Sequence, residues 1–549
     1  MLELIAQLVA PPLQNSPIRL PGPDATEQRL GPDRKPAPVE LDSTPQPEPQ
    51  PGPKPDQAPT GDTPALPLSA LPEIRGLSRY SQQQLETILA SCRQVADPAQ
   101  RLTDCAAALT ARLVADGYVN SRVYVEKEPA PGQLEVVEGR LVELRVTSVS
   151  PRLQRKVFRL LKPLQGQVLH LPTVQRDLRL LRRVPGVGDV KGSLSRLGSD
   201  PSQAIFSVVV QAGNRPWQGE FSIRNDGSPG SGEYRGSGAL VKGDLATADD
   251  ILLLYGEMNW TNNPDLGSLI TSVSYTLPLG ESFNITGSFG YSKNYSPEFD
   301  TNEADISSDQ LQGLGQAEYV FKETLSQRWS VFLGASGNRN TIEVGLPNDP
   351  DLSVTQNTSY LRLGVAGNGL SGPVAWGGNA YLLQALSSDF IDAGSATAIG
   401  GLVSAGWAFA PSWQLNARLG GQLAFNTLPT SMYFSLGSDV GLRGLPGQLV
   451  SGENGWLGTL ELAWAFWQNR TNTLQLVPFI GAGGVNTALN QGSFNDTVGS
   501  GGILARWLAG QNWAIELGYV HQFNTNDNLG VWNDWILDDG LYAKVQFRF

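Results

Sequence analysis

The residue types that carry out most enzyme chemistry are scarce in this sequence of 549 residues. Its two histidines, His170 and His521, lie far apart and leave little room for a metal site or a catalytic triad. The two cysteines, Cys92 and Cys105, exclude a disulfide-dense scaffold and a cysteine-rich zinc module. We find no nucleophile, metal or phosphate motif, so an enzyme is the least favoured function and no cofactor is expected.

Charged side chains that could bind a partner cluster on two predicted helices, near residues 153–161 and 173–183. The candidates are Arg152, Arg155, Arg176 and Arg179. They form either a solvated helix face or a docking surface for an acidic or extended client protein. The formal net charge of the chain is −12, from 40 basic and 52 acidic residues, which argues against nucleic acid as the main partner.

The composition leaves one kind of membrane protein open. Charged residues make up 17% of the chain, below the roughly 25% of typical soluble proteins, and glycine is abundant with 61 residues. No run of about 18 apolar residues occurs, so the sequence predicts no transmembrane helix. A long, glycine-rich, charge-poor chain still fits a transmembrane β-barrel.

The C-terminal region alternates apolar and small polar residues. Residues 283–291 follow this pattern, and so do residues 271–277 before them. A short turn at residues 278–282 joins the two segments, and a long acidic loop is expected at residues 293–310. Soluble β-sandwiches also alternate, but rarely over so long a region. At roughly 20 residues for each strand and its connection, residues 214–549 predict an antiparallel barrel of about sixteen strands.

The last strand has the clearest pattern. One face carries Leu541, Ala543, Val545, Phe547 and Phe549, and the other carries Lys544 and Arg548. A charged side chain that faces lipid costs several kcal/mol, so the odd-numbered face must be the outer one. Phe547 and the terminal Phe549 match the assembly signal by which bacteria recruit barrel-assembly machinery.

The N-terminal region is expected to lie outside any folded core. Residues 1–10 are a short apolar run without the basic start of a signal peptide. They are a signal remnant, an amphipathic helix or the product of a misassigned start codon. Residues 11–72 are rich in proline and predict an extended, disordered linker.

Between the linker and the barrel, residues 73–146 and 147–213 each predict a small α/β unit. In the first unit, helices are expected at residues 81–92, with Ser81 as N-cap, and 103–116, and strands at 121–126 and 133–146. In the second unit, the two predicted helices precede strands near residues 189–197 and 204–211. Both units share the order strand, helix, helix, strand, strand, and this repetition is more informative than either unit alone.

These features together resemble the transporters of two-partner secretion, of the haemolysin-activator type, within the superfamily of outer-membrane assembly and translocation barrels. Residues 117–122 and 136–140 resemble the first of the family's two POTRA domains, and residues 173–186 resemble the second. Residues 437–445 resemble the superfamily's Val-Arg-Gly-aromatic loop motif. Its core here is Arg443, Gly444 and Leu445, with Leu442 in place of the valine and Leu445 in place of the aromatic residue. The likeness covers about residues 75–549.

The resemblance implies transport without covalent chemistry. Two periplasmic POTRA domains would capture an unfolded client, a large adhesin- or haemolysin-like protein, and the outer-membrane barrel would pass it to the cell surface. An N-terminal helix would plug the lumen at rest. The implied partners are this client, outer-membrane lipids and barrel-assembly machinery. The alternatives are an assembly factor for other barrels, which usually carries more POTRA domains, and a porin with periplasmic domains that anchor it to the cell wall.

The resemblance also implies roles for single residues. The family usually places an aspartate at the position of Gly481, where it receives the motif arginine inside the barrel. Glycine removes that partner from Arg443, and an unpaired buried charge is costly. Glu461 is the candidate substitute, because the alternation of its strand points it into the lumen.

Cys92 and Cys105 would lie on the two helices of the first POTRA domain, in a compartment that permits disulfides. The resemblance therefore implies a structural disulfide between them. Two free buried thiols are the alternative.

Overall fold

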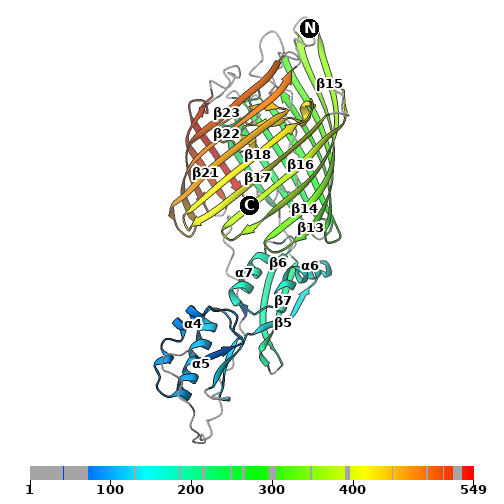
Figure 1. Cartoon of the computed structure of the whole chain (residues 1–549). Coiled ribbons are helices and arrows are strands. Elements are labelled where there is room, and N and C mark those ends of the chain that lie inside the picture. The colour runs from blue at the N-terminus through cyan, green and yellow to red at the C-terminus, as the bar shows by residue number, and fades with distance from the viewer. Residues whose placement is uncertain are drawn as a thin grey trace. The chain divides into compact units, whose positions relative to one another are not determined.

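The computed structural model contains two compact units, one within residues 35–214 and the other containing residues 215–549 (Figure 1). The structure describes residues 41–42, 72–128, 132–182, 184, 187–198, 200–212, 217–247, 250–261, 266–295, 305–346, 349–389, 396–447, 449–489, 492–510, 512–523 and 535–549. The predictions for residues 1–10 and for most of the linker lie outside these described residues. Within them, no helix is long and apolar enough to cross a membrane.

The first α/β unit combines two helices with a sheet of order β2-β4-β3. Its elements are β2 (Glu73–Arg75), α4 (Gln82–Ile88), α5 (Pro98–Ala115), β3 (Arg122–Glu126) and β4 (Gln133–Val137). Ser81 and Gln84 form a capping box at the start of α4, in agreement with the predicted N-cap. The second helix begins earlier than predicted because Asp97 caps it and Pro98 occupies its first turn.

The second α/β unit has the same order of elements and contains the sheet β1-β6-β7-β5. Its elements are β5 (Arg140–Ser148), α6 (Pro151–Leu161), α7 (Leu171–Leu181), β6 (Val187–Leu197) and β7 (Asp200–Ala212). The predicted single strand at residues 133–146 is wrong, because β4 pairs with β3 whereas β5 pairs in parallel with β7. The boundary between the units therefore falls before Arg140 rather than after residue 146.

The two α/β units contact each other around Gly117 and His170. The amide of Leu171 donates to the carbonyl of Gly117 at 2.9 Å, and the rings of Tyr118 and His170 have centroids 4.9 Å apart. Gly117 has a φ of +93°, and a Cβ there would lie 2.5 Å from Cδ of Pro172. Only glycine fits this contact, and His170 serves the joint between the units.

A short piece of the linker joins the second sheet. β1 (Leu41–Asp42) pairs in parallel with β6, with Leu41 opposite Gly192 and Asp42 opposite Ser193. The prediction that the linker has no fold is wrong for these two residues. Without β1, β6 would be an edge strand of the sheet, and an edge strand offers main-chain groups that any extended segment can bind.

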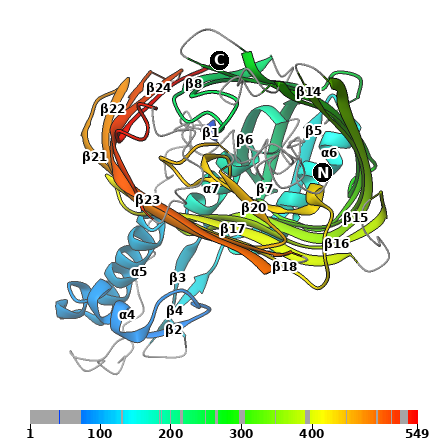
Figure 2. The ribbon, with the colours of Figure 1, turned by 90° about the horizontal axis from the view of Figure 1, so that it is seen from above.

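The unit that contains residues 215–549 is a closed antiparallel barrel of 16 strands, which Figure 2 shows from above. The strands are β8 (Gln218–Arg224), β9 (Tyr234–Gly243), β10 (Ile251–Trp260), β11 (Leu266–Leu279), β12 (Phe283–Tyr295), β13 (Asp305–Glu323), β14 (Gln327–Leu346), β15 (Asp349–Ser371), β16 (Val374–Ser388), β17 (Thr397–Ala410), β18 (Trp413–Ala424), β21 (Asn454–Gln468), β22 (Asn472–Leu489), β23 (Gly492–Ala509), β24 (Trp513–Phe523) and β25 (Leu541–Arg548). Consecutive barrel strands pair with each other, and β25 closes the barrel on β8. The predicted fold class is thereby confirmed.

The strand connections differ from the prediction at one loop. Residues 280–282 separate β11 from β12, as the predicted turn requires. The acidic loop predicted at residues 293–310 is wrong at both ends, because β12 extends to Tyr295 and β13 begins at Asp305. Lys293 and Asp309 are instead paired across these strands, with Lys293 Nζ 3.8 Å from Asp309 Oδ2. Opposite charges facing each other across a ladder favour the longer strands.

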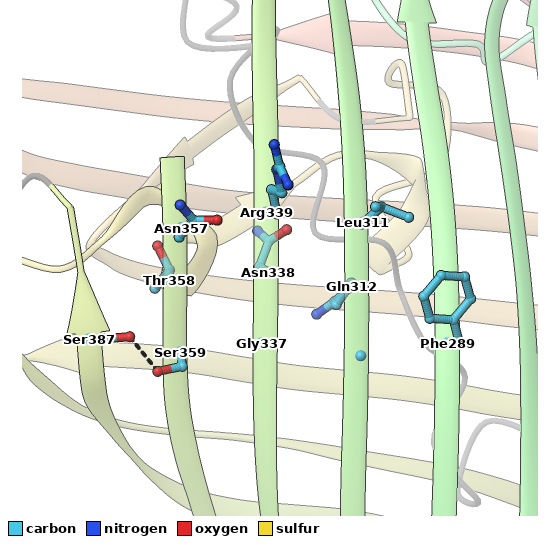
Figure 3. A pocket seen from close by; sticks show the side chains of 11 residues that line it. Phe289, Leu311, Gln312, Gly337, Asn338, Arg339, Asn357, Thr358, Ser359 and Ser387 are labelled. Atoms are coloured by element: carbon cyan, nitrogen blue, oxygen red, sulfur yellow. Dashed lines mark hydrogen bonds between the residues drawn. The ribbon is translucent and has the colours of Figure 1, made fainter. Parts of the chain in front are cut away.

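The outer face of the barrel carries an apolar band between two interfaces. On β14 the outward side chains run from Trp329 through Val331 and Leu333 to Arg339. Ten residues of a strand tilted by about 40° rise roughly 25 Å, the usual height of such a band. A hollow of about 360 Å³ is lined by Phe289 and Leu311 together with polar and charged side chains of β13 to β16, among them Arg339 and Asn357 (Figure 3).

Aromatic rings mark the lower edge of the band, near the end at which the chain enters the barrel. The rings of Trp413 and Trp464 stack at 5.4 Å, those of Trp329 and Trp376 lie 5.2 Å apart, and Trp513 contacts Phe547 at 4.7 Å. Such a girdle is typical of barrels in a membrane interface.

The inner face is polar and hydrogen-bonded. Hydroxyl pairs bridge neighbouring strands at Ser274 and Ser288, 2.8 Å apart, and at Thr276 and Thr286, 2.9 Å apart. These contacts satisfy polar groups along the wall without any apolar core in this part of the barrel.

Candidate functional site

The loop between β18 and β21 folds back into the barrel. It contains the 3-10 turns Thr430–Met432 and Ser438–Val440 and the short strands β19 (Phe434–Leu436) and β20 (Val450–Gly452), and Figure 2 shows β20 inside the ring of strands. Leu436, Leu442, Leu445 and Leu449 are almost fully buried and belong to one apolar cluster with Val520 of the wall. Burial of these leucines holds the motif residues inside the lumen.

Arg443 binds two acids on the barrel wall. Its Nε donates to Oε1 of Glu461 on β21, and its Nη1 donates to Oε2 of Glu516 on β24 at 2.6 Å. Arg506 on β23 joins the group, with Nε 2.7 Å from Glu516 Oε1 and Nη2 4.0 Å from Glu461 Oε2. Two arginines and two glutamates thus form a set of paired charges, with Lys544 of β25 opposite Glu516, and this pairing offsets much of the cost of taking the charges out of water.

At Gly481, where the family usually has an aspartate, the space for a side chain is filled by Leu442 of the loop. A Cβ added to Gly481 of β22 would lie 3.1 Å from Cδ2 of Leu442 and 3.2 Å from Cγ2 of Thr459. The leucine that replaces the motif valine therefore occupies the space above Gly481. The acids that bind Arg443 instead lie on β21, which is next to β22, and on β24, which is two strands away: Glu461 and Glu516.

Gly444 is required by its close approach to the wall. Its φ is +74°, and a Cβ there would lie 2.0 Å from Cγ1 of Val520. Its carbonyl accepts a hydrogen bond from Nε2 of Gln522 at 2.9 Å. Any side chain at this position would push the loop off β24.

A second ion pair anchors the loop to the first strands of the barrel. Asp439 binds Nη1 of Arg235 on β9, and Nη2 of Arg235 lies 2.7 Å from Oε2 of Glu257 on β10. The three side chains are only 5% to 7% exposed. The amide of Gly447 also donates to the carbonyl of Gly227, in the connection between β8 and β9.

The sequence reasoning named Arg443 and Glu461 but missed Glu516, Arg506 and the Asp439–Arg235 pair. Glu516 could have been found, because the alternation of β24 points it to the same side as the lumen-facing residues. Arg506 likewise lies on the lumenal side of β23, opposite Glu516. The Asp439–Arg235 pair depends on the path of the loop, which no periodicity reports. Within the described part of the chain, no group of three or more His, Cys, Asp or Glu side chains could hold a metal ion.

Comparisons with known proteins agree with this geometry. The family model of the haemolysin secretion/activation protein ShlB/FhaC/HecB matches residues 205–365 and 396–503. The outer membrane transporter CdiB of Dickeya dadantii (strain 3937) is 24% identical over 439 residues, which cover 73% of this chain and 74% of that protein.

The chain belongs to the two-partner secretion transporters.

Solved structures of this kind share the fold. CdiB from Escherichia coli superposes with a TM-score of 0.56 at 15% identity, covering 91% of this chain and 93% of that one. CdiB from Acinetobacter baumannii gives a TM-score of 0.52 at 15% identity, covering 100% and 96%.

The predicted function and location are confirmed with the family. The transporter lies in the outer membrane, with its two POTRA domains in the periplasm, and translocates a secreted protein partner. The family consists of transporters rather than a known class of enzymes.

The seam of the transporter, where β25 meets β8, is short. The ladder joins five residue pairs, from Lys544 opposite Arg224 to Arg548 opposite Glu220. Phe549 extends it by exchanging two main-chain hydrogen bonds with Gly219. Lys544 lies beside the lumenal Glu516, and Phe549 is exposed on the outer face, so the strand faces as the alternation predicts.

The POTRA residues singled out from sequence lie in separate places. Cys92 and Cys105 form a disulfide with Cα atoms 5.2 Å apart. Cys105 lies on α5, whereas Cys92 lies in a 3-10 turn after α4, because that helix ends at Ile88. Of the arginines, Arg152 and Arg155 lie on α6, and Arg176 and Arg179 lie on α7. Arg176 binds Asp177 at 3.0 Å, so part of its charge is already neutralised.

Proposed function

We propose that this transporter captures an unfolded adhesin- or haemolysin-like client on the edges of its POTRA sheets and passes it through the barrel when the motif loop leaves its resting place. Barrel-assembly machinery recognises the terminal strand through Phe547 and Phe549, and outer-membrane lipids surround the apolar band.

One observation carries this proposal: the motif loop lies in the lumen and is held there by Arg443. The loop closes on Glu461 and Glu516 with paired charges, so leaving this place requires breaking specific ion pairs rather than melting a strand of the wall. A chain entering the lumen must meet this loop, and the loop is therefore the natural gate.

The capture step is supported by the pairing of β1 with β6. Leu41 and Asp42 show that β6 accepts an extended segment through main-chain contacts. Such contacts demand little of the partner's sequence, as capture of a long unfolded client requires. The edge strand β3 of the first POTRA domain offers a second place of the same kind.

The gate can be tested by locking the loop to the wall. Because a Cβ at Gly481 lies close to the end of the Leu442 side chain, the double variant Leu442→Cys/Gly481→Cys places two thiols across that contact, and oxidation by a short bis-methanethiosulfonate reagent can link them through disulfide bonds. We expect the oxidised variant to secrete at least tenfold less client, and reductant to restore secretion.

The controls are the two single cysteine variants and the parent chain under the same reductant, since reductant also attacks Cys92–Cys105. Full secretion by a variant whose new bridge is verified by mass spectrometry would mean that the loop stays in place during transport.

The capture step has a separate test. A photo-crosslinking amino acid at Ser195, an exposed residue of β6, should trap the client during secretion. The same probe at Arg179, exposed on α7, is the matched position on the helical side. Crosslinks at Arg179 alone would favour the basic helices as the docking surface.

A further inference from the structure

The motif loop spans the seam of the barrel from the inside. The wall strands run in the order β23-β24-β25-β8-β9-β10, so the seam between the last and first strands lies at the centre of this group. On one side of the seam the loop binds β24, through Arg443 to Glu516 and through the Gly444 carbonyl to Gln522. On the other side it binds β9, through Asp439 to Arg235.

The seam has a short ladder of its own. Its five main-chain pairs compare with ten between β9 and β10 and ten between β10 and β11. Above the ladder, Asn225 supplies side-chain contacts in place of a strand, with Nδ2 donating to Leu541 O at 2.7 Å and Oδ1 accepting from the amide of Ala543 at 2.8 Å. A seam with few main-chain bonds depends more on what lies across it.

The loop contacts on the first-strand side are buried and charged. Arg235 is held between Asp439 and Glu257, each almost fully buried, and the amide of Gly447 reaches the carbonyl of Gly227 beside it. A charge-assisted hydrogen bond in such surroundings contributes more than a neutral or exposed one. Buried ion pairs therefore hold the loop on both sides of the seam, at β9 through Asp439 and at β24 through Arg443.

We propose that the loop ties the seam shut, and that Asp439 and Arg235 are positioning residues that fasten it to the first strands. With both anchors in place, β24 and β9 are joined through the loop as well as through β25 and β8. Loss of either anchor leaves the seam to its five-pair ladder, the bonds between Phe549 and Gly219, and the contacts of Asn225. The tie belongs to the resting barrel, so it holds or fails independently of any loop movement during secretion.

The test measures amide hydrogen exchange, by mass spectrometry, in the full-length protein in detergent micelles. The variants are Asp439→Asn, which keeps the shape of the side chain, and Arg443→Gln at the other anchor. Each should exchange at least fivefold faster than the parent in β8 and β25, while β14 to β17, on the far wall, keep their rates.

The matched control is Glu318→Gln. Glu318 binds Arg328 at 2.9 Å and is also an almost buried lumenal acid, but its partner lies on β14, away from the loop. This variant should leave the exchange of β8 and β25 unchanged. Asp439→Glu, which retains the charge, should restore most of the protection lost in Asp439→Asn.

Three results would overturn the proposal. Unchanged exchange of the seam in both anchor variants would mean that its ladder suffices alone. Equal acceleration in every strand would mean general destabilisation, as would a Glu318→Gln variant that loosens the seam equally. If the Asp439→Asn barrel is too unstable to purify, Arg443→Gln tests the proposal in its place. The proposal requires loss of either anchor to accelerate amide exchange in β8 and β25.

Discussion

Leu442 lies directly above Gly481, so that a Cβ on the glycine would come within 3.1 Å of the leucine side chain. The two departures from the family pattern therefore meet at one contact: the larger motif residue occupies the space beside the glycine, and the negative charge that pairs with Arg443 lies on β21 and β24 instead. Glu461 and Glu516 supply that charge.

This contact predicts the behaviour of the restored aspartate. Gly481→Asp alone should lower secretion severalfold, because the new carboxylate meets the apolar side chain of Leu442 and competes with Glu461 and Glu516 for Arg443. The triple variant Gly481→Asp/Leu442→Val/Glu461→Gln should secrete more than Gly481→Asp, since it relieves the contact and restores the charge balance. Client in the medium, measured against the amount of folded barrel, decides between these outcomes. If the triple variant secretes no more client than Gly481→Asp, residues 442 and 481 do not depend on each other.

The cluster around Arg443 predicts a pattern of non-additive defects. Arg443→Ala should reduce secretion about tenfold or more without lowering the amount of folded barrel. Glu461→Gln and Glu516→Gln should each cause a smaller defect, because the arginine keeps one partner. The double variant Arg443→Ala/Glu461→Gln should secrete no less than Arg443→Ala, since members of one pair share one interaction. Multiplying defects would show that the two residues act separately.

The Cys92–Cys105 disulfide is expected in protein taken from its native envelope, and mass spectrometry of non-reduced peptides should detect it. The bridge encloses a short loop, so its removal by Cys92→Ser/Cys105→Ser should destabilise the first POTRA domain by about 2–4 kcal/mol. Proteolysis at increasing urea should then cut this domain earlier and leave the barrel intact. Two free thiols in native material would contradict the pairing.

Phe549 is expected to be needed for insertion. Its ring stacks on Phe221 with centroids 6.0 Å apart, and its main chain closes the seam with Gly219. Deleting Phe549 should reduce insertion into the outer membrane several-fold, while the POTRA domains remain folded. Phe158→Ala, which removes a half-exposed ring on α6, is the control for loss of an aromatic residue. Normal insertion of the truncated chain would remove the assembly role from this residue.

Asp177 makes the stability of the second POTRA domain depend on pH. Burial on α7 raises the pKa of this carboxyl above its ordinary value of 3.8, although Arg176 opposes the change. The folded form therefore binds the proton more tightly than the unfolded form, and this stabilisation is lost as the pH rises from about 4 through the raised pKa. Asp177→Asn should remove this dependence between pH 4 and pH 7. Urea midpoints from pulse proteolysis at the two pH values measure it; equal changes with pH in both proteins would contradict the assignment.

Much of the fold could be read from local patterns. Alternation along β11, β12 and β25 identified barrel strands and their faces, because a strand between lipid and lumen must alternate. The N-cap Ser81 placed the start of α4 for a similarly local reason. Local signals were weaker at strand ends, where Lys293 and Asp309 looked like loop residues until their pairing across β12 and β13 was known.

The remaining errors concern contacts between distant segments. Residues 133–146 form an unbroken strand pattern, yet the strand is divided between Val137 and Arg140. At Gly139 the backbone packs so closely on Asn120 that a Cβ would not fit, a contact between distant residues that no local signal reports. Glu461 was predicted as the partner of Arg443 from the direction of its strand alone. Asp439 and Arg235 could not be paired in the same way, because their meeting depends on a loop path set by buried leucines.

The seam also governs when this barrel can exist. Arg548 and Glu220 meet across 328 positions in the chain, and their strands are the last and the first of the barrel. Bringing such distant segments together is entropically costly and slow, and closure must wait until β25 has been made and exported. Until then the strands expose apolar side chains and unpaired edges outside a closed barrel, and this state is the most prone to aggregation. The lifetime of that unclosed chain, rather than the stability of the finished barrel, should limit how much transporter a cell can produce.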